Sequence, residues 1–291
     1  MSGITYGILA MFGWGVGEFT AKKAVDEYGE HKAYLYVQAI GALIATLIAY
    51  SYGQLKAELF TLPLLGLSLL IGATYSIAYL NAFKAYRIGK LAIVSPILCS
   101  YGMLSSILAA IFLNQTLSLL QFIGIIVIIS GTFLLSLDFE ELRKSFKFTA
   151  YPGVKEAIIT FLFFGINSVL LDFTVVESNL HLVNTLNSIF SLFTISAIFV
   201  YFSKSDKATH PASITKNGIT FMIATAILTA LANLWFIIGY SRGDSILIAP
   251  IGASSGVITS ILSFIFLKEK LTKIQLVGMV STFVGIILIS L

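Results

Sequence analysis

Charged side chains are scarce in this sequence. Asp, Glu, Lys and Arg make up 11% of its 291 residues, whereas apolar residues make up 57% and the mean hydropathy is +0.94. A soluble domain normally carries about 25% charged residues, and a single soluble core stops growing near about 250–300 residues. So few polar groups cannot cover so much apolar surface in water. The composition therefore predicts a protein whose solvent is the lipid bilayer.

Cysteine, histidine and clustered basic residues are also nearly missing. The single cysteine, Cys99, cannot form an internal disulfide, and His31, His181 and His210 are too far apart in the sequence to suggest a metal site. The sequence has no basic run with interleaved aromatics, which would favour nucleic-acid binding. The sequence also has no Walker lysine, which would favour an ATPase, and no zincin motif, which would favour a metalloprotease. We therefore expect no cofactor, no metal, no nucleic-acid partner and no catalytic residue, and we do not expect an enzyme.

Ten apolar stretches are long enough to cross the hydrocarbon core, which needs about 20 residues per helix. Runs of this length without strict alternation favour helices over barrel strands. The sequence thus predicts an all-α membrane protein with ten transmembrane helices. The predicted helices are Ile4–Ala21, Tyr34–Tyr52, Leu62–Phe83, Leu91–Leu113, Leu119–Leu137, Val154–Val176, Leu182–Phe202, Gly218–Tyr240, Ile246–Leu267 and Ile274–Ser290.

The second half of the chain repeats the first half at a displacement of 154 residues. Between Tyr86 and Leu137, 19 of 52 positions are identical to the positions 154 residues later, without a gap. Shared Leu and Ile are expected between apolar helices, but shared Tyr, Gly, Pro and Gln in one register indicate an internal repeat. The most informative pairs are Tyr86/Tyr240, Pro96/Pro250, Gly102/Gly256, Gln121/Gln275, Gly124/Gly278 and Gly131/Gly285.

Each half contains five predicted helices, and an odd number makes the second half enter the membrane from the opposite face. We therefore predict a first five-helix repeat over residues 1–137, a connecting loop over 138–153 and a second, inverted five-helix repeat over 154–291. Inverted repeats place a binding site near the middle of the membrane and permit alternating access to it.

Positive charges gather in the loops on one side of the predicted helices. The loops after helices 1, 3, 5, 7 and 9 hold 16 of the 18 Lys and Arg residues, and the opposite loops hold only Lys56 and Arg242. Short loops rich in positive charge face the cytoplasm. We therefore predict a multi-pass protein of the cell membrane with both termini outside.

Two carboxylates lie well inside apolar stretches, Glu18 in the first predicted helix and Asp172 in the sixth. Ionisable groups inside a membrane are costly and often mark functional sites. Both residues are therefore candidates for binding the substrate or a coupling proton. The alternative for Glu18 is a structural ion pair with Lys22, one helical turn away.

Amide and aromatic side chains complete the candidate substrate-binding residues. An amide can donate to and accept from a solute, but it can equally join two helices. Aromatic rings can wall an amphipathic solute, and anchoring at the membrane interface is their alternative role. These candidates are Asn81, Asn167, Asn187, Asn233, Trp14, Tyr79, Tyr101 and Trp235.

Pro96 and Pro250 occupy matching places early in the fourth and ninth predicted helices. Proline removes a backbone donor and bends a helix, and small residues such as Gly252 and Gly256 let helices cross closely. We interpret these four residues as hinge and packing features and not as ligands.

Several segments are similar to a known family. Residues 8–24, ILAMFGWGVGEFTAKKA, resemble the Phe-Trp-Gly opening of the EamA family of the drug/metabolite transporter superfamily. Residues 112–131, FLNQTLSLLQFIGIIVIISG, and 266–285, FLKEKLTKIQLVGMVSTFVG, resemble its two repeat signatures, in which a helix ends near an acidic residue and the next opens with Gln and Gly. Glu269 keeps the acidic residue, and Gln115 departs from it. The membrane carboxylate of the small multidrug exporters would fall on Trp14, so their exchange site is not carried over.

The resemblance implies a secondary transporter that exports small metabolites, such as amino acids or related solutes. A sugar uptake porter of the same superfamily is one alternative, and a non-transporting membrane sensor or subunit is another. The expected partners are a small-molecule substrate, the lipid bilayer and the proton as a coupling ion. A monomer would suffice, because both repeats lie in one chain.

The predicted orientation can be tested with a reporter that is active only in the cytoplasm. Fused to the C-terminus, it should stay silent. One predicted membrane span separates the C-terminus from the cytoplasmic loop that carries Lys268, Lys270 and Lys273, so the C-terminus lies outside. The same reporter inserted after Lys270 is the control and should be active. An active C-terminal fusion would show that the orientation is wrong.

Overall fold

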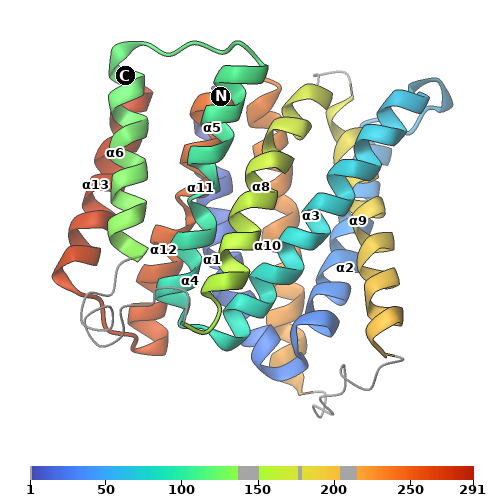
Figure 1. The fold of residues 1–291 in the computed structure, drawn as a ribbon. Helices are drawn as coiled ribbons and strands as arrows, with labels where there is room; N and C mark the ends of the chain where they lie inside the picture. The colour runs from blue at the N-terminus through green and yellow to red at the C-terminus, as the bar shows by residue number, and fades with distance from the viewer. Residues whose placement is uncertain (1, 137–150, 176–178, 204–214) are drawn as a thin grey trace.

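The protein was studied as a computed structural model, which describes residues 2–136, 151–175, 179–203 and 215–291. Within these residues every regular element is a helix (Figure 1). An apolar chain in lipid must satisfy its backbone N–H and C=O groups internally, and a helix does so within one segment. Eight of the described helical segments are long and apolar enough to cross a membrane, which is the composition of a multi-pass membrane protein.

The helices follow one another with short connections. The first half holds α1 (Gly3–Tyr28), α2 (Glu30–Ser51), a single 3-10 turn (Ala57–Leu59), α3 (Leu62–Ile88), α4 (Leu91–Cys99), α5 (Tyr101–Phe112) and α6 (Leu119–Ser136). The second half holds α8 (Val154–Thr174), α9 (Leu180–Ser203), α10 (Lys216–Tyr240), α11 (Ser245–Ala253), α12 (Ser255–Leu262), a π-helical turn (Ser263–Leu267) and α13 (Lys273–Ser290). Most of the predicted connecting loop, residues 138–150, and His210 lie outside the described residues.

Two described helices do not meet the length and hydropathy of the eight candidate spans. The apolar stretch of α6, Leu119–Leu135, is shorter than the others. α1 is long, but Glu18 and several charged residues after it lower its apolar character. The predicted count of ten spans therefore does not follow from length and composition alone.

Two predicted spans are each divided at a serine. The breaks fall at Ser100, between α4 and α5, and at Ser254, between α11 and α12. Each serine follows a proline, Pro96 or Pro250, by four residues, and its N–H donates to the carbonyl of that proline at 3.1 Å. Proline lacks an N–H and its ring crowds the preceding turn, so each of these segments is built from two shorter helices.

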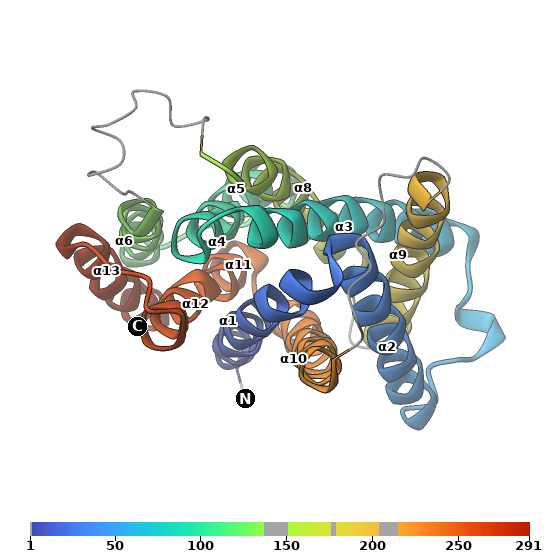
Figure 2. The ribbon, with the colours of Figure 1, turned by 90° about the horizontal axis from the view of Figure 1, so that it is seen from below.

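Helices of the two halves pair with one another across the molecule. α6 packs on α13, α1 on α10, α3 on α8 and α2 on α9, while α4 meets α12 and α5 meets α11. α4 with α5, and α11 with α12, can each be counted as one segment. Each helix of the first half then has a counterpart in the second half, and replacing every helix by its counterpart gives the same list of pairs. Figure 2 shows the α6–α13 pair at one side of the molecule and the α2–α9 pair at the other. The two halves are therefore interleaved.

Glycines and prolines of the repeat meet where α4 and α5 cross α11 and α12. A Cβ atom added to Gly256 would lie 3.2 Å from Cα of Pro96, and one added to Gly102 would lie 2.8 Å from Cα of Pro250. Each glycine thus faces the proline of the other half, and the absent side chain lets the backbones approach. The earlier residue of each segment meets the later residue of the other, so the two segments run antiparallel.

In the pair formed by α6 and α13, residues of the two halves also meet in reverse order. A Cβ atom added to Gly124 would lie 3.0 Å from the carbonyl oxygen of Gly285, and one added to Gly131 would lie 2.6 Å from that of Gly278. These four glycines are the ones that the 154-residue register aligns, Gly124 with Gly278 and Gly131 with Gly285. The repeat therefore preserves the residues that hold the two halves together.

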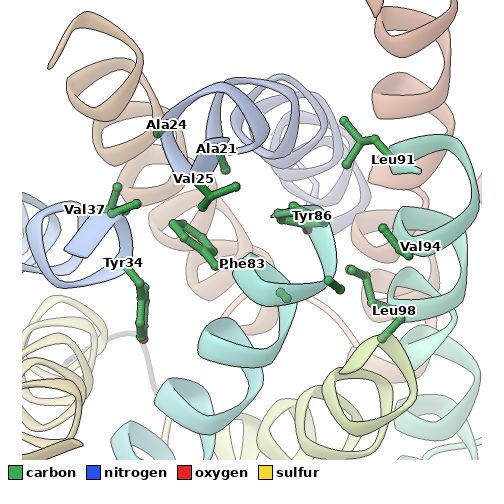
Figure 3. Packing of buried hydrophobic residues seen from close by; sticks show 14 of the residues in the cluster. Ala21, Ala24, Val25, Tyr34, Val37, Phe83, Tyr86, Leu91, Val94 and Leu98 are labelled. Atoms are coloured by element: carbon green, nitrogen blue, oxygen red, sulfur yellow. The ribbon is translucent and has the colours of Figure 1, made fainter. Parts of the chain in front are cut away.

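A buried apolar cluster fills one end of the molecule, and Figure 3 draws part of it. Most of its residues come from the end of α1, the start of α2, the end of α3 and the start of α4, which short turns bring together, and α8, α9 and α10 supply the others. The labelled members include Val25, Tyr34, Phe83, Tyr86 and Leu91. Close packing of this kind excludes water from that end of the helices.

Ion pairs lie at the same end as this cluster. Arg87 on α3 pairs with Glu30 at the start of α2 at 2.8 Å, and Lys84 on α3 pairs with Glu156 at the start of α8 at 2.9 Å. The second pair joins the two halves of the chain. Both termini lie at the opposite end of the molecule (Figure 1).

Replacing Gly102 with alanine tests the close crossing. The added methyl group would meet Cβ of Ala253 and Cα of Pro250 at 2.8 Å, and overpacking of this kind costs about 1–3 kcal/mol. We therefore expect Gly102→Ala to lower the midpoint of thermal unfolding of the purified protein.

Gly66→Ala is the matched control, because Gly66 also lies in a helix but has no atom within 4 Å of an added Cβ. Alanine favours a helix over glycine by about 0.5–1 kcal/mol, so this variant should be neutral or slightly more stable. Equal midpoints for the two variants would contradict the crossing.

Candidate functional site

A cavity of about 80 Å³ lies between the two halves. On this scale one water molecule needs roughly 10–15 Å³, so the cavity has room for a small solute or several waters. It is lined by α1, α3, α4 and α5 of the first half and by α8, α9, α10 and α12 of the second. The predicted residues that line it are Trp14, Glu18, Tyr79, Tyr101, Asn167, Asn187 and Asn233.

Aromatic rings form one wall of the cavity. The ring centroids of Tyr75 and Tyr79, both on α3, lie 4.4 Å apart. Phe164 on α8 lies 5.0 Å from Tyr79 and 5.4 Å from Tyr101. Tilted and edge-on contacts between rings are favourable, so this wall is formed in advance of any ligand and presents apolar faces with hydroxyl groups at their edges.

A hydrogen-bonded bridge runs from one half of the chain to the other and back. The indole N–H of Trp14 on α1 donates to the amide oxygen of Asn233 on α10 at 3.0 Å. The amide nitrogen of Asn233 in turn donates to the hydroxyl of Tyr75 on α3. The bridge therefore uses both ends of the Asn233 amide and joins three helices around the cavity.

Gly252 makes room for the indole ring at this wall. A Cβ atom added to Gly252 would lie 2.9 Å from the ring of Phe236 and 3.1 Å from the ring of Trp14. These two rings pack edge-on with 4.8 Å between their centroids. Gly252 is thus a packing residue at the cavity as well as part of the crossing segment.

The carboxylate of Glu18 accepts four hydrogen bonds. The hydroxyls of Ser95 and Thr259 donate to Oε2, the second at 2.7 Å. The hydroxyl of Ser255 donates to Oε1 at 2.8 Å, and the thiol of Cys99 donates to the same oxygen at 3.5 Å. Donors from both halves of the chain thus hold the carboxylate at the edge of the cavity.

The close crossing of the helices supplies these donors. Ser95 and Cys99 lie on α4 on either side of Pro96, and Ser255 directly precedes Gly256, which packs on that proline. The alternative of an ion pair between Glu18 and Lys22 is not formed. Lys22 pairs with Asp26 at 2.8 Å instead.

Three further amides reach the cavity, and one of them has a free acceptor. Asn167 donates to the carbonyl of Ile71 at 2.8 Å and to the hydroxyl of Thr74 at 2.9 Å, which joins α8 to α3. The amide oxygen of Asn187 is buried and has no hydrogen-bond partner among the described residues, and Asn184 lies one turn before it on α9. Buried polar groups normally find a partner, so Asn187 is suited to a solute or a water.

Three of the predicted residues lie outside the cavity wall. The amide of Asn81 donates to the carbonyl of Ile77 in its own helix at 2.8 Å. Asp172 accepts from the amide of Gln115 at 3.0 Å. Trp235 packs against a buried apolar cluster and does not line the cavity.

Gln115 has a structural role at the place where it departs from the family pattern. Besides its bond to Asp172, its amide oxygen accepts from the N–H of Ile246 at 2.9 Å, at the start of α11. In the other half Glu269 accepts from the N–H of Leu91, at the start of α4, at 3.3 Å. The two residues correspond in the 154-residue register, and each accepts from a backbone N–H in the first turn of a repeat-related helix, the amide at α11 and the carboxylate at α4.

The hydroxyl and thiol groups around Glu18 were not among the predicted residues. Ser95, Cys99, Ser255 and Thr259 are small and common in membrane helices, and nothing in their own sequence neighbourhood resembles a site. The available signal was their position, since each lies within about one turn of a proline or glycine that the repeat aligns.

Comparison with known proteins bears on these features. The model of the EamA-like transporter family matches residues 1–137 and 152–291. The chain belongs to the EamA-like transporter family. The resemblance seen in the sequence is thereby confirmed. As an EamA-family protein the chain is a multi-pass membrane transporter with a small-molecule substrate.

Individual relatives add little about the substrate of this EamA-family protein. The uncharacterized protein MJ1333.1 of Methanocaldococcus jannaschii is 34% identical over 73 residues, which are 25% of this chain and 53% of that protein. The chain thus matches about half the length of this relative. A crystal structure of another protein is similar over 99% of this chain and 96% of that one, with a TM-score of 0.74 and 15% identity. At that identity the likeness shows the fold alone.

Asn233→Ala should destabilise the protein through the bridge at the cavity. The indole N–H of Trp14 would lose its acceptor and the hydroxyl of Tyr75 its donor, and each unpaired group costs about 1–3 kcal/mol where it is buried. Asn81→Ala is the control, because its amide bonds only within α3. We expect a clear drop in the thermal midpoint for the first variant and a small change for the second; the reverse order would contradict the bridge.

Proposed function

We propose that this protein is a secondary transporter that moves small metabolites across the cell membrane by alternating access. In this proposal ten spans form two inverted five-helix repeats, residues 1–137 and 154–291, joined by residues 138–153. The observation that carries the proposal is the cavity between the two halves, which residues of both halves line. A site shared by inverted repeats can face either side of the membrane when one repeat rocks against the other.

The antiparallel contacts support the inversion. Pro96 meets Gly256 while Gly102 meets Pro250, and the paired glycines of α6 and α13 follow the same exchange. Two copies that ran in the same direction would bring matching residues together in the same order. The observed order is the reverse, as expected for a two-fold axis in the plane of the membrane.

The cavity wall favours a small solute with an apolar or flat part and several hydrogen-bonding groups. Tyr79 and Tyr101 offer ring faces, and the oxygen of Asn187 offers an acceptor. Amino acids and related solutes fit this description, with Trp14, Glu18, Asn167 and Asn233 completing the wall. Ring faces and amides also suit a sugar, so a sugar uptake porter is the second candidate.

Direction and orientation are also part of the proposal. The resemblance to exporters favours export, and the loop charges favour a cytoplasmic position for the end that carries the Lys84–Glu156 and Arg87–Glu30 ion pairs. Among the described residues that line the cavity, Glu18 is the one with a carboxylate, so we assign the coupling ion to it. A monomer suffices, because one chain supplies the whole wall.

Alkylation of Cys99 tests the function directly. Cys99 is the single cysteine of the sequence and lines the cavity, so a small maleimide reports on this site alone. A solute present at ten times its dissociation constant should slow the alkylation about tenfold, because it leaves about one molecule in eleven free. We expect members of a panel of amino acids to protect Cys99 and to raise the thermal midpoint, and sugars to do neither.

Two variants serve as controls. Cys99→Ser should not be labelled, and Asn81→Ala should keep the protection, because Asn81 lies outside the cavity wall. Protection by sugars in place of amino acids would favour the sugar porter. Protection by neither class, together with no solute flux in liposomes, would favour the non-transporting sensor or subunit.

A further inference from the structure

Oxygen atoms from α1, α4 and α12 surround the carboxylate of Glu18. The hydroxyl of Thr259 lies 2.7 Å from Oε2 of Glu18, and it also lies 3.1 Å from the carbonyl oxygens of Gly15 and of Ser255. One hydroxyl proton therefore faces three acceptors. The hydroxyls of Ser95 and Ser255 complete this group of neutral oxygen atoms.

The hydroxyl protons near Glu18 have other acceptors to turn to. Thr259 can donate to either carbonyl, and Ser255 lies 3.2 Å from the sulfur of Cys99, which also lies 3.9 Å from the hydroxyl of Ser95. A hydroxyl that donates elsewhere presents its lone pairs to the carboxylate side. The same side chains can therefore serve either as donors to Glu18 or as ligands of a cation placed beside it.

The negative charge of Glu18 has no positive partner among the described residues. The titratable groups that face it are Tyr79 and Tyr86 on α3, Cys99 on α4 and Tyr101 on α5, and none of them is basic. A buried charge is costly unless it is paired or coordinates a metal. A cation beside Glu18 would balance this charge, and the surrounding hydroxyl and carbonyl oxygens could serve as its ligands.

The repeat shows that packing does not require this carboxylate. In the 154-residue register Thr259 corresponds to Ser105, which donates to the hydroxyl of Ser168 at 2.7 Å, and Ser168 also bonds to the hydroxyl of Tyr240. The second copy of the crossing is thus built from neutral hydroxyls. Glu18 breaks the symmetry of the two halves, and it does so at the edge of the cavity.

We propose that Glu18, Ser95, Ser255, Thr259 and the carbonyl oxygen of Gly15 form a binding site for Na⁺. One carboxylate with neutral hydroxyl and carbonyl oxygens suits a hard monovalent cation, whereas Ca²⁺ is normally held by more carboxylates. The ligands lie beside the helix breaks at Ser100 and Ser254, and coupling-ion sites of transporters are typically built from broken helices at the repeat interface. The inference rests on the proposed function, since it identifies the coupling ion of that site.

Sodium binding can be measured on the purified full-length protein at one pH and one ionic strength. Radioactive ²²Na⁺ should bind in a saturable way, be displaced by unlabelled Na⁺ and be displaced poorly by K⁺. The thermal midpoint should rise with the concentration of NaCl, but not with that of KCl or N-methyl-D-glucamine chloride, because an ion that binds only the folded state stabilises it. Equal midpoints in all three salts and no ²²Na⁺ binding would overturn the proposal.

Three variants locate the site. Glu18→Gln removes the charge, and Thr259→Val removes one hydroxyl while keeping the shape of the side chain, so each should weaken Na⁺ binding about tenfold or more. Ser105→Ala changes the corresponding residue of the other half and should bind Na⁺ as the unmodified protein does. Equal losses in Thr259→Val and Ser105→Ala, or no loss in Thr259→Val, would exclude this site.

The two proposals fail in different ways. Solutes could protect Cys99 and raise the thermal midpoint equally well in Na⁺ and in N-methyl-D-glucamine while ²²Na⁺ does not bind. That result would support the proposed transporter and exclude the sodium site. If ²²Na⁺ binds and Thr259→Val abolishes it, the sodium site stands whatever solute is carried.

Discussion

The close crossing of the two halves is the constraint on which the other features depend. Pro96 fits against Gly256 and Pro250 against Gly102, and neither contact leaves room for a Cβ atom on the glycine without movement of a backbone. The prolines break both segments, and the glycines let them touch. The groups that bond to Glu18 lie around the contact between Pro96 and Gly256, next to the cavity. A change in this crossing would therefore alter the fold and the site together.

The apolar composition explains why the polar groups are so tightly used. Within lipid each side-chain donor or acceptor needs a partner inside the protein. The bridge from Trp14 through Asn233 to Tyr75 and the bonds of Asn167 to α3 meet this need while joining helices of different halves. The amide oxygen of Asn187, which has no hydrogen-bond partner among the described residues, lies at the cavity. This oxygen is an acceptor that a solute in the cavity can use.

The sequence predicts the helices and the contacts between halves better than it predicts the site. The aligned Gly102 and Gly256 lie at the crossing, because a Cβ atom on either glycine would press on the backbone of the aligned proline of the other half. Asn81 and Asn233 look alike in the sequence, yet one bonds within its own helix and the other bridges three. The angular position of each residue on its helix decides which groups its amide can reach. An error of one residue in the predicted position of the helix would exchange the two expectations. The hydroxyls near Glu18 stay hidden for a related reason, since serine and threonine in helices commonly bond to their own backbone.

The inversion of the two halves is the central claim, and labelling of repeat-related loops tests it most directly. Thr116 and Lys270 are exposed, correspond in the 154-residue register and lie in the connections before α6 and before α13, at opposite ends of the molecule (Figure 1). In a Cys99→Ser background, cysteines placed singly at these positions would be treated in intact cells with a maleimide that does not cross membranes. The account predicts that Thr116→Cys is labelled at once and Lys270→Cys only after the membrane is opened. Labelling of both from the same side would contradict it.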